Sequence, residues 1–183
     1  MNPLTPAMLS QWQNFYVVVG SSAGALTGLQ FVVMTLVAQA HAAGNERDIH
    51  AFGTPTVIHF CTALLLSALM TAPWQSVAVL GVCLGAFGLL GIGYCFRVAG
   101  HARQAAYNPD AEDRFWYIVL PMVAHVALVG AAYLIYRAVA WSPAVLAVAA
   151  LVFLLLGVHN SWDTVTYLAV KHGAKKPQAG DAV

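Results

Sequence analysis

Charged residues are scarce in this 183-residue sequence: aspartate, glutamate, lysine and arginine make up 8% of it, against 60% hydrophobic residues. A water-soluble domain carries about 25% charged residues, because its surface must face water. Eight basic and seven acidic side chains are too few to cover a soluble particle of this length. The apolar side chains must therefore face lipid, and the sequence predicts an integral membrane protein.

Basic clusters, paired cysteines and reaction motifs are missing as well. A formal net charge of +1 gives no patch for nucleic acid, and no nucleic-acid-reading motif is present, so no nucleic-acid partner is expected. The three cysteines stand in apolar stretches without a CxxC or CxC pair and are interpreted as small hydrophobic residues. Neither a phosphate-binding glycine loop nor a nucleophile set occurs. The sequence therefore identifies no catalytic residue, and we favour a protein that is not an enzyme.

What the sequence does contain is five long apolar runs. Crossing a hydrocarbon core of roughly 30 Å takes about 20 residues of helix. We therefore predict an all-α bundle of five transmembrane helices, a single domain over residues 1–170, followed by a disordered cytoplasmic tail at 171–183. Thr54 and Pro55 resemble a helix cap with proline at the first position, which predicts where the second helix starts. The five predicted spans are about 15–38, 55–72, 76–96, 115–139 and 143–170.

The basic residues predict the orientation of these spans. With five crossings, one side of the membrane receives all the lysines and arginines except Arg137. Basic loops remain in the cytoplasm, so we expect the N-terminus outside and the C-terminus inside a plasma or bacterial inner membrane. The residues assigned to the cytoplasmic side are Arg47, Arg97, Arg103, Arg114, Lys171, Lys175 and Lys176.

Glycines recur at intervals of four in the first and third spans. Small residues at this spacing let helices approach closely in lipid, where the hydrophobic effect does not drive association. We expect them to form helix contacts, either within the chain or at a seam with a second copy or a partner membrane subunit. The glycines in question are Gly20, Gly24, Gly28, Gly81 and Gly85.

Polar side chains inside the predicted spans are few, and four of the helices place them at similar depths. Such groups are costly in a membrane and therefore indicate function. At 1.5 Å of rise per residue, they fall in the cytoplasmic half of the bilayer. The predicted residues for binding an ion or substrate are Gln30, His59, His125, His159, Asn160 and Asp163.

Two local patterns refine this prediction. His159 and Asp163 are four residues apart on one helix face, so we expect the carboxylate to orient the ring, while Asn160 belongs to a neighbouring stripe. In the fourth span, Pro121 cannot donate to the carbonyl of Tyr117, which predicts a kink in the helix one turn before His125.

Together these features favour a channel or transporter for an ion, proton or small solute. One alternative is a membrane-embedded metal protein with hydrolase or redox activity. It would use His59, His125, His159 and Asp163 as zinc ligands, or two of the histidines to bind haem. Another is a non-catalytic subunit of a larger membrane complex. None of these hypotheses fixes a cofactor, and membrane lipid is the one partner that all of them share.

Overall fold

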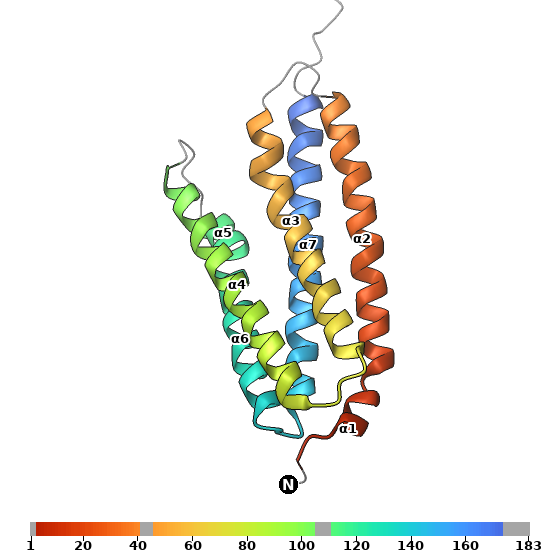
Figure 1. Cartoon of the computed structure of the whole chain (residues 1–183). Helices are drawn as coiled ribbons and strands as arrows, with labels where there is room; N and C mark the ends of the chain where they lie inside the picture. Colours follow the sequence, from red (N-terminus) through yellow and green to blue (C-terminus); the bar gives the residue numbers. More distant parts are fainter. Residues whose placement is uncertain (1–2, 41–45, 105–110, 174–183) are drawn as a thin grey trace, which may run out of the picture.

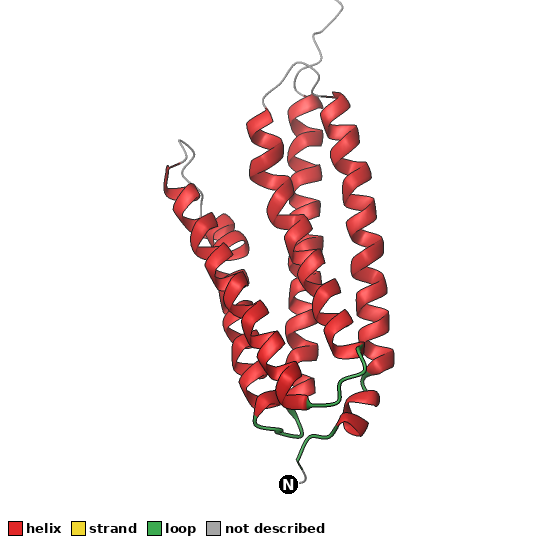
Figure 2. Ribbon diagram, viewed as in Figure 1, coloured by secondary structure: helices red, strands yellow, loops and turns green. Residues whose placement is uncertain are grey.

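The computed structural model describes residues 3–40, 46–104 and 111–173, with side chains at 3–35, 55–100 and 111–166 apart from position 113. Every regular element in these ranges is a helix (Figure 1; Figure 2), which confirms the all-α prediction. The elements are α1 Pro6–Ser10, α2 Gln13–Ala40, α3 Glu46–Thr71, α4 Val77–Gln104, α5 Ala111–Arg114, the π-helical segment η1 Phe115–Val119, α6 Leu120–Tyr136 and α7 Ser142–Gly173.

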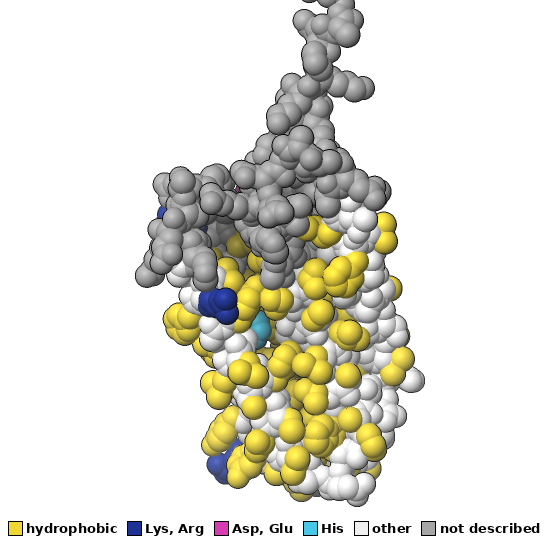
Figure 3. Space-filling view, turned by 45° about the horizontal axis from the view of Figure 1, so that its top comes forward, with side chains coloured by type: hydrophobic (Ala, Val, Ile, Leu, Met, Phe, Trp, Pro, Cys, Tyr) yellow, Lys and Arg dark blue, Asp and Glu magenta, His cyan; other side chains and the backbone are white. Residues whose placement is uncertain are grey.

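Four helical segments are long and apolar enough to cross a membrane, as in a multi-pass membrane protein. They are Gln13–Thr35, Val77–Gly100, Phe115–Tyr136 and Ser142–Thr166. The part of α3 with described side chains, Pro55–Thr71, is a shorter apolar helix. Figure 3 shows one face of the molecule largely covered by hydrophobic side chains, as contact with lipid requires.

The long helices alternate in direction along the chain (Figure 1). One group contains α2, α3 and α7, and a hairpin of α4 and α6 joins it through contacts between α6 and α7. We call the end where α2 and α7 finish the upper end, and the end with α1 and the short loops the lower end. Toward the upper end, α4 leans away from α3 (Figure 1).

The helices extend beyond the predicted apolar runs, most clearly in α3. This helix begins at Glu46 rather than at the predicted Pro55, which lies inside it. A proline inside a membrane helix is tolerated when neighbouring groups compensate for the lost hydrogen bond. Residues 46–54 were missed because they are too polar to register as part of a span. Residues 174–183 of the predicted tail lie outside the described residues.

Where the sequence predicts a kink before His125, the chain forms η1, a π-helical turn that directly precedes the Pro121 turn of α6. In it the hydrogen bonds skip one residue further than in an α-helix, and the backbone N–H of Leu120 donates to the carbonyl of Phe115. The proline interrupts the regular ladder, as the sequence predicts.

In α4, glycines form the contact surface for α6. A Cβ atom added at Gly81 would come within 2.7 Å of the Tyr136 backbone nitrogen, and one at Gly85 would lie 3.8 Å from the Ala132 Cβ. The two helix backbones are therefore close at Gly81, as small residues permit in a membrane.

The glycines of α2 differ among themselves. A Cβ atom added at Gly20 would lie 2.9 Å from the Ser67 Cβ on α3. One added at Gly24 would lie 3.9 Å from the side chain of Leu64, also on α3. Gly28 is exposed and has nothing within 4 Å among the described residues. An oligomer seam or partner subunit at that position stays a prediction.

Candidate functional site

The buried polar residues of α2, α3 and α7 include two amides and one imidazole, Gln30, Asn160 and His59, which we call the polar layer. Their exposed fractions are 3%, 0% and 2%, respectively. Each comes from a different helix. All three belong to the set predicted from the sequence.

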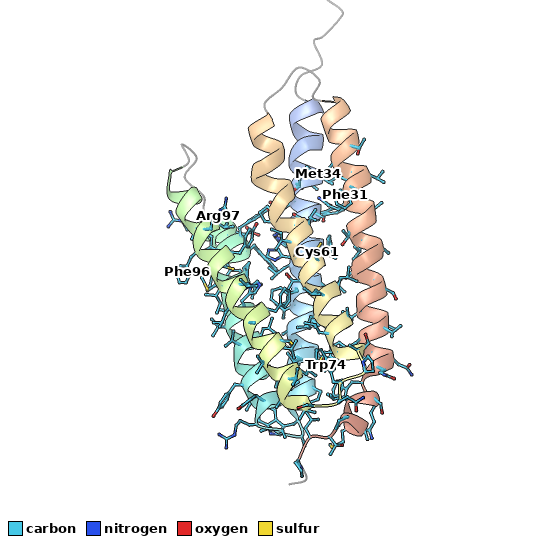
Figure 4. All side chains as sticks on the ribbon, in the orientation of Figure 1. Phe31, Met34, Cys61, Trp74, Phe96 and Arg97 are labelled. Carbon is cyan, nitrogen blue, oxygen red and sulfur yellow. The ribbon has the colours of Figure 1, made fainter. Side chains whose placement is uncertain are left out.

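Two contacts place the members of the layer at neighbouring levels. Gln30 Oε1 accepts a hydrogen bond of 2.9 Å from Ser161 Oγ, beside Asn160. A Cβ atom added at Gly157 would overlap the ring of Phe60, the neighbour of His59. Because α3 and α7 run in opposite directions (Figure 1), Asn160, three residues after Gly157, and His59, one residue before Phe60, both lie on the upper side of this contact. In Figure 4, Phe31 of α2 and Cys61 of α3, neighbours of Gln30 and His59 in sequence, both lie well above Trp74.

His59 and Asn160 also meet at a common face of α7. The His59 ring stacks near the Phe153 ring, with centroids 6.4 Å apart. Phe153 and Asn160 are seven residues apart, two helical turns, so they point in nearly the same direction. The two polar side chains are therefore turned into the same core.

The hydrogen-bonding capacity of this layer is largely unused. Among the described residues, five of its buried side-chain atoms have no hydrogen-bond partner: Gln30 Nε2, both ring nitrogens of His59, and both Nδ2 and Oδ1 of Asn160. Buried polar atoms in folded proteins are nearly always bonded, to protein or to water. Leaving one unbonded costs about 1–3 kcal/mol. Within the described part of the chain, these five atoms are therefore left without a protein partner.

His125 of α6 also contacts Phe153, but its hydrogen bonding differs from that of His59. The two rings are 4.6 Å apart and meet edge to face. His125 Nδ1 lies 2.8 Å from the carbonyl oxygen of Pro121 and 3.7 Å from Cys95 Sγ. Since a carbonyl only accepts, Nδ1 carries a proton here, and a neutral ring keeps its lone pair on Nε2.

Separate contacts join α7 to η1 and involve the remaining two predicted residues, His159 and Asp163. The rings of His159 and Trp116 stack, with centroids 3.6 Å apart and an interplanar angle of 10°. The hydroxyl of Tyr117 donates to Asp163 Oδ2 at 3.0 Å. We call this pair of contacts the η1 clamp.

The η1 clamp changes two predictions. Asp163 was expected to orient His159, but its carboxylate accepts from Tyr117, while His159 Nδ1 has no partner among the described residues. The six predicted polar side chains therefore do not form one group: three are in the polar layer, two are in the η1 clamp, and His125 packs against Phe153. The reason is that His159 and Asn160, adjacent in α7, point about 100° apart, toward η1 and toward α3.

The four-ligand metal set is not assembled. Within the described ranges, no three His, Cys, Asp or Glu side chains are placed to hold a metal ion, and His59, His125, His159 and Asp163 are no exception. A zinc site needs three or four ligands converging on one point. The separation of His159 and Asp163 from the polar layer accounts for this result.

The η1 clamp makes a measurable contribution to stability. We expect Tyr117→Phe to lower the free energy of unfolding by about 1 kcal/mol, because a hydrogen bond to a partly exposed carboxylate is lost. Tyr133→Phe is the control: its hydroxyl accepts from Arg137 Nη1 at 3.1 Å on an exposed surface, and its loss should change little. Unfolding by SDS in mixed micelles measures both. Equal effects of the two variants would contradict the clamp.

Several residues of these sites were not predicted from the sequence. Phe153, Trp116 and Ser161 were not among the predicted site residues, although each touches a predicted histidine or amide. The aromatic run 115–117 next to Pro121 was the available signal for a packed, irregular turn. Comparison with protein families, curated proteins and solved structures finds no match for this chain.

Proposed function

We propose that the protein is a membrane channel or transporter that passes an ion, proton or small polar solute through the polar layer of Gln30, His59 and Asn160. The observation that carries the proposal is a set of five buried polar atoms from three helices that have no hydrogen-bond partner among the residues the structure describes. Polar groups at membrane depth are costly and are found where they bind or conduct something.

We further propose five spans, with the N-terminus outside and the C-terminus in the cytoplasm of the cell membrane. In support, α3 has 26 residues, and a helix of that length reaches about 39 Å, more than a hydrocarbon core. It also packs against both α2 and α7. The basic residues then segregate seven to one. A C-terminal fluorescent-protein fusion should be fluorescent and an alkaline phosphatase fusion inactive; the reverse pattern would contradict this topology.

The part of the core below the polar layer supports a gated path rather than an open one. Phe60 and Phe153 are buried there, and Ala23 and Ala63 fill the space between the helices. At the lower end, the Tyr16 hydroxyl donates to the Pro143 carbonyl at 2.9 Å and ties α2 to α7. Passage through this core would require Phe60 or Phe153 to move, so transport would be slow and gated.

The test is flux into proteoliposomes, with protein-free vesicles as the baseline. Protons, potassium, chloride, urea and water are offered in turn. We expect at least one flux above the baseline, reduced about ten-fold or more in Asn160→Leu and His59→Leu, because the unbonded atoms are removed. Asn14→Leu, which changes an exposed asparagine of α2, is the matched control and should conduct normally.

Two results would contradict transport through this layer. One is the absence of any flux above the baseline from well-folded protein. The other is a flux that Asn160→Leu and His59→Leu leave as large as Asn14→Leu does. Circular dichroism and gel filtration of each variant in detergent distinguish loss of transport from loss of fold.

A further inference from the structure

We infer that the polar layer selects a small, electrically neutral solute that both donates and accepts hydrogen bonds, of the chemical class of water and urea. This inference rests on the proposed transport function and narrows its substrate class. It is argued from the charge, the hydrogen-bonding pattern and the size of the layer.

The first argument is the absence of fixed charge. The described polar residues that are buried are hydroxyl, amide and imidazole side chains; no aspartate, glutamate, lysine or arginine is among them. Asp163, the acidic residue closest in sequence to the layer, faces η1 and bonds to Tyr117. Arg97 and Arg137 are exposed. An ion entering the layer would lose its hydration without meeting an opposite charge among the buried side chains that the structure describes, and burial of an unpaired ion is strongly unfavourable.

The second argument is the pattern of donors and acceptors. The two amide nitrogens, Gln30 Nε2 and Asn160 Nδ2, are donors, and Asn160 Oδ1 is an acceptor. A neutral His59 ring adds one donor and one acceptor. A bare cation would bond only to the acceptors and an anion only to the donors, leaving the remaining atoms unbonded. A neutral solute with both N–H or O–H groups and lone pairs can bond to donors and acceptors alike.

The third argument is size. The Phe60 ring lies against Gly157 so closely that even a methyl group there would overlap it. Asn160 sits one turn above Gly157 and has no exposed surface. A solute of a few heavy atoms is what such a core admits, and a buried water needs only two to four polar partners.

The experiment compares neutral and charged probes in the same proteoliposomes. Stopped-flow light scattering follows water and urea, and a pH-sensitive dye and ion electrodes follow protons, potassium and chloride. We expect urea and water flux above that of protein-free vesicles, reduced about ten-fold in Asn160→Ala and less in Asn160→Ser, which keeps a hydroxyl. Ion fluxes should equal the protein-free baseline. Asn14→Ala again serves as the matched exposed control.

The possible outcomes separate this inference from the proposed function. An ion flux that depends on Asn160, without Asn160-dependent urea or water flux, would overturn the neutral substrate class while leaving transport through the layer intact. No flux of any probe would overturn both. Should Asn160→Ala fail to fold, Gln30→Leu and its exposed counterpart Gln13→Leu provide the same comparison on α2.

Discussion

Gly91→Ala is expected to destabilise the protein by about 1–3 kcal/mol, whereas Gly93→Ala, two residues further along α4, should be neutral or stabilising. A Cβ atom at Gly91 would overlap the imidazole of His125 on α6, while nothing among the described residues lies within 4 Å of a Cβ at Gly93. Alanine stabilises a helix relative to glycine by about 1 kcal/mol. Gly93→Ala should keep this gain, whereas at Gly91 the clash with His125 outweighs it.

The clash at Gly91 is not easily relieved, because His125 is held from several sides. Its ring is 2% exposed, donates to the Pro121 carbonyl and packs against Phe153. Rotating the ring away would break this hydrogen bond and disturb the contact between α6 and α7. Thermal unfolding in detergent compares the two variants. A stability of Gly91→Ala equal to that of Gly93→Ala would show that the His125 ring does not occupy this position.

This pair of glycines illustrates what the sequence can and cannot predict. Regular spacing singled out Gly81 and Gly85, which lie against α6. Gly91 is outside that spacing, and its importance comes from the side chain opposite it. A repeat identifies a helix surface but not the residue on the partner helix, because that depends on the relative rotation and register of the two helices.

The same limit explains the outcome for the candidate site. Helical periodicity predicted two polar stripes on α7, one with His159 and Asp163 and one with Asn160. Both stripes exist, but the sequence does not say which neighbour each meets. The order of helices around the bundle decides that: one stripe faces η1 and the other faces α3. The depth of a side chain in the membrane can be estimated by counting residues along its helix. Which neighbouring helix that side chain faces cannot be obtained in this way.

The boundaries of the helices show a second limit. Hydropathy located all the apolar segments, since a long apolar run is typical of a helix that faces lipid. It placed the start of α3 nine residues late, at Pro55 instead of Glu46, because the first turns of that helix are polar. A helix can continue past the hydrocarbon boundary into water, where its backbone remains bonded and its side chains need not be apolar.

The largest expected effect on transport is at Phe60, which lies between the polar layer and the lower half of the core. Under the proposed function, Phe60→Ala should increase urea or water flux severalfold, because the ring that closes the core is removed. It should also reduce stability by about 3–5 kcal/mol at most, the usual cost of emptying a buried aromatic site. Phe31→Ala is the control: Phe31 is 59% exposed, and its loss should change neither quantity much.

A second substitution tests whether Phe60 acts through its contact with α7. Gly157→Ala alone should reduce stability, because the added methyl group overlaps the buried ring. In the double variant Phe60→Ala/Gly157→Ala, that overlap is gone. The double variant should therefore lose less unfolding free energy than the two single variants lose in sum, by about 0.5–3 kcal/mol. The flux of the double variant should fall back toward that of the unmodified protein, since the new methyl group occupies part of the opened space. Additive stabilities and an unchanged high flux would mean that Phe60 and Gly157 do not meet, and the path would then have to run elsewhere than between α3 and α7.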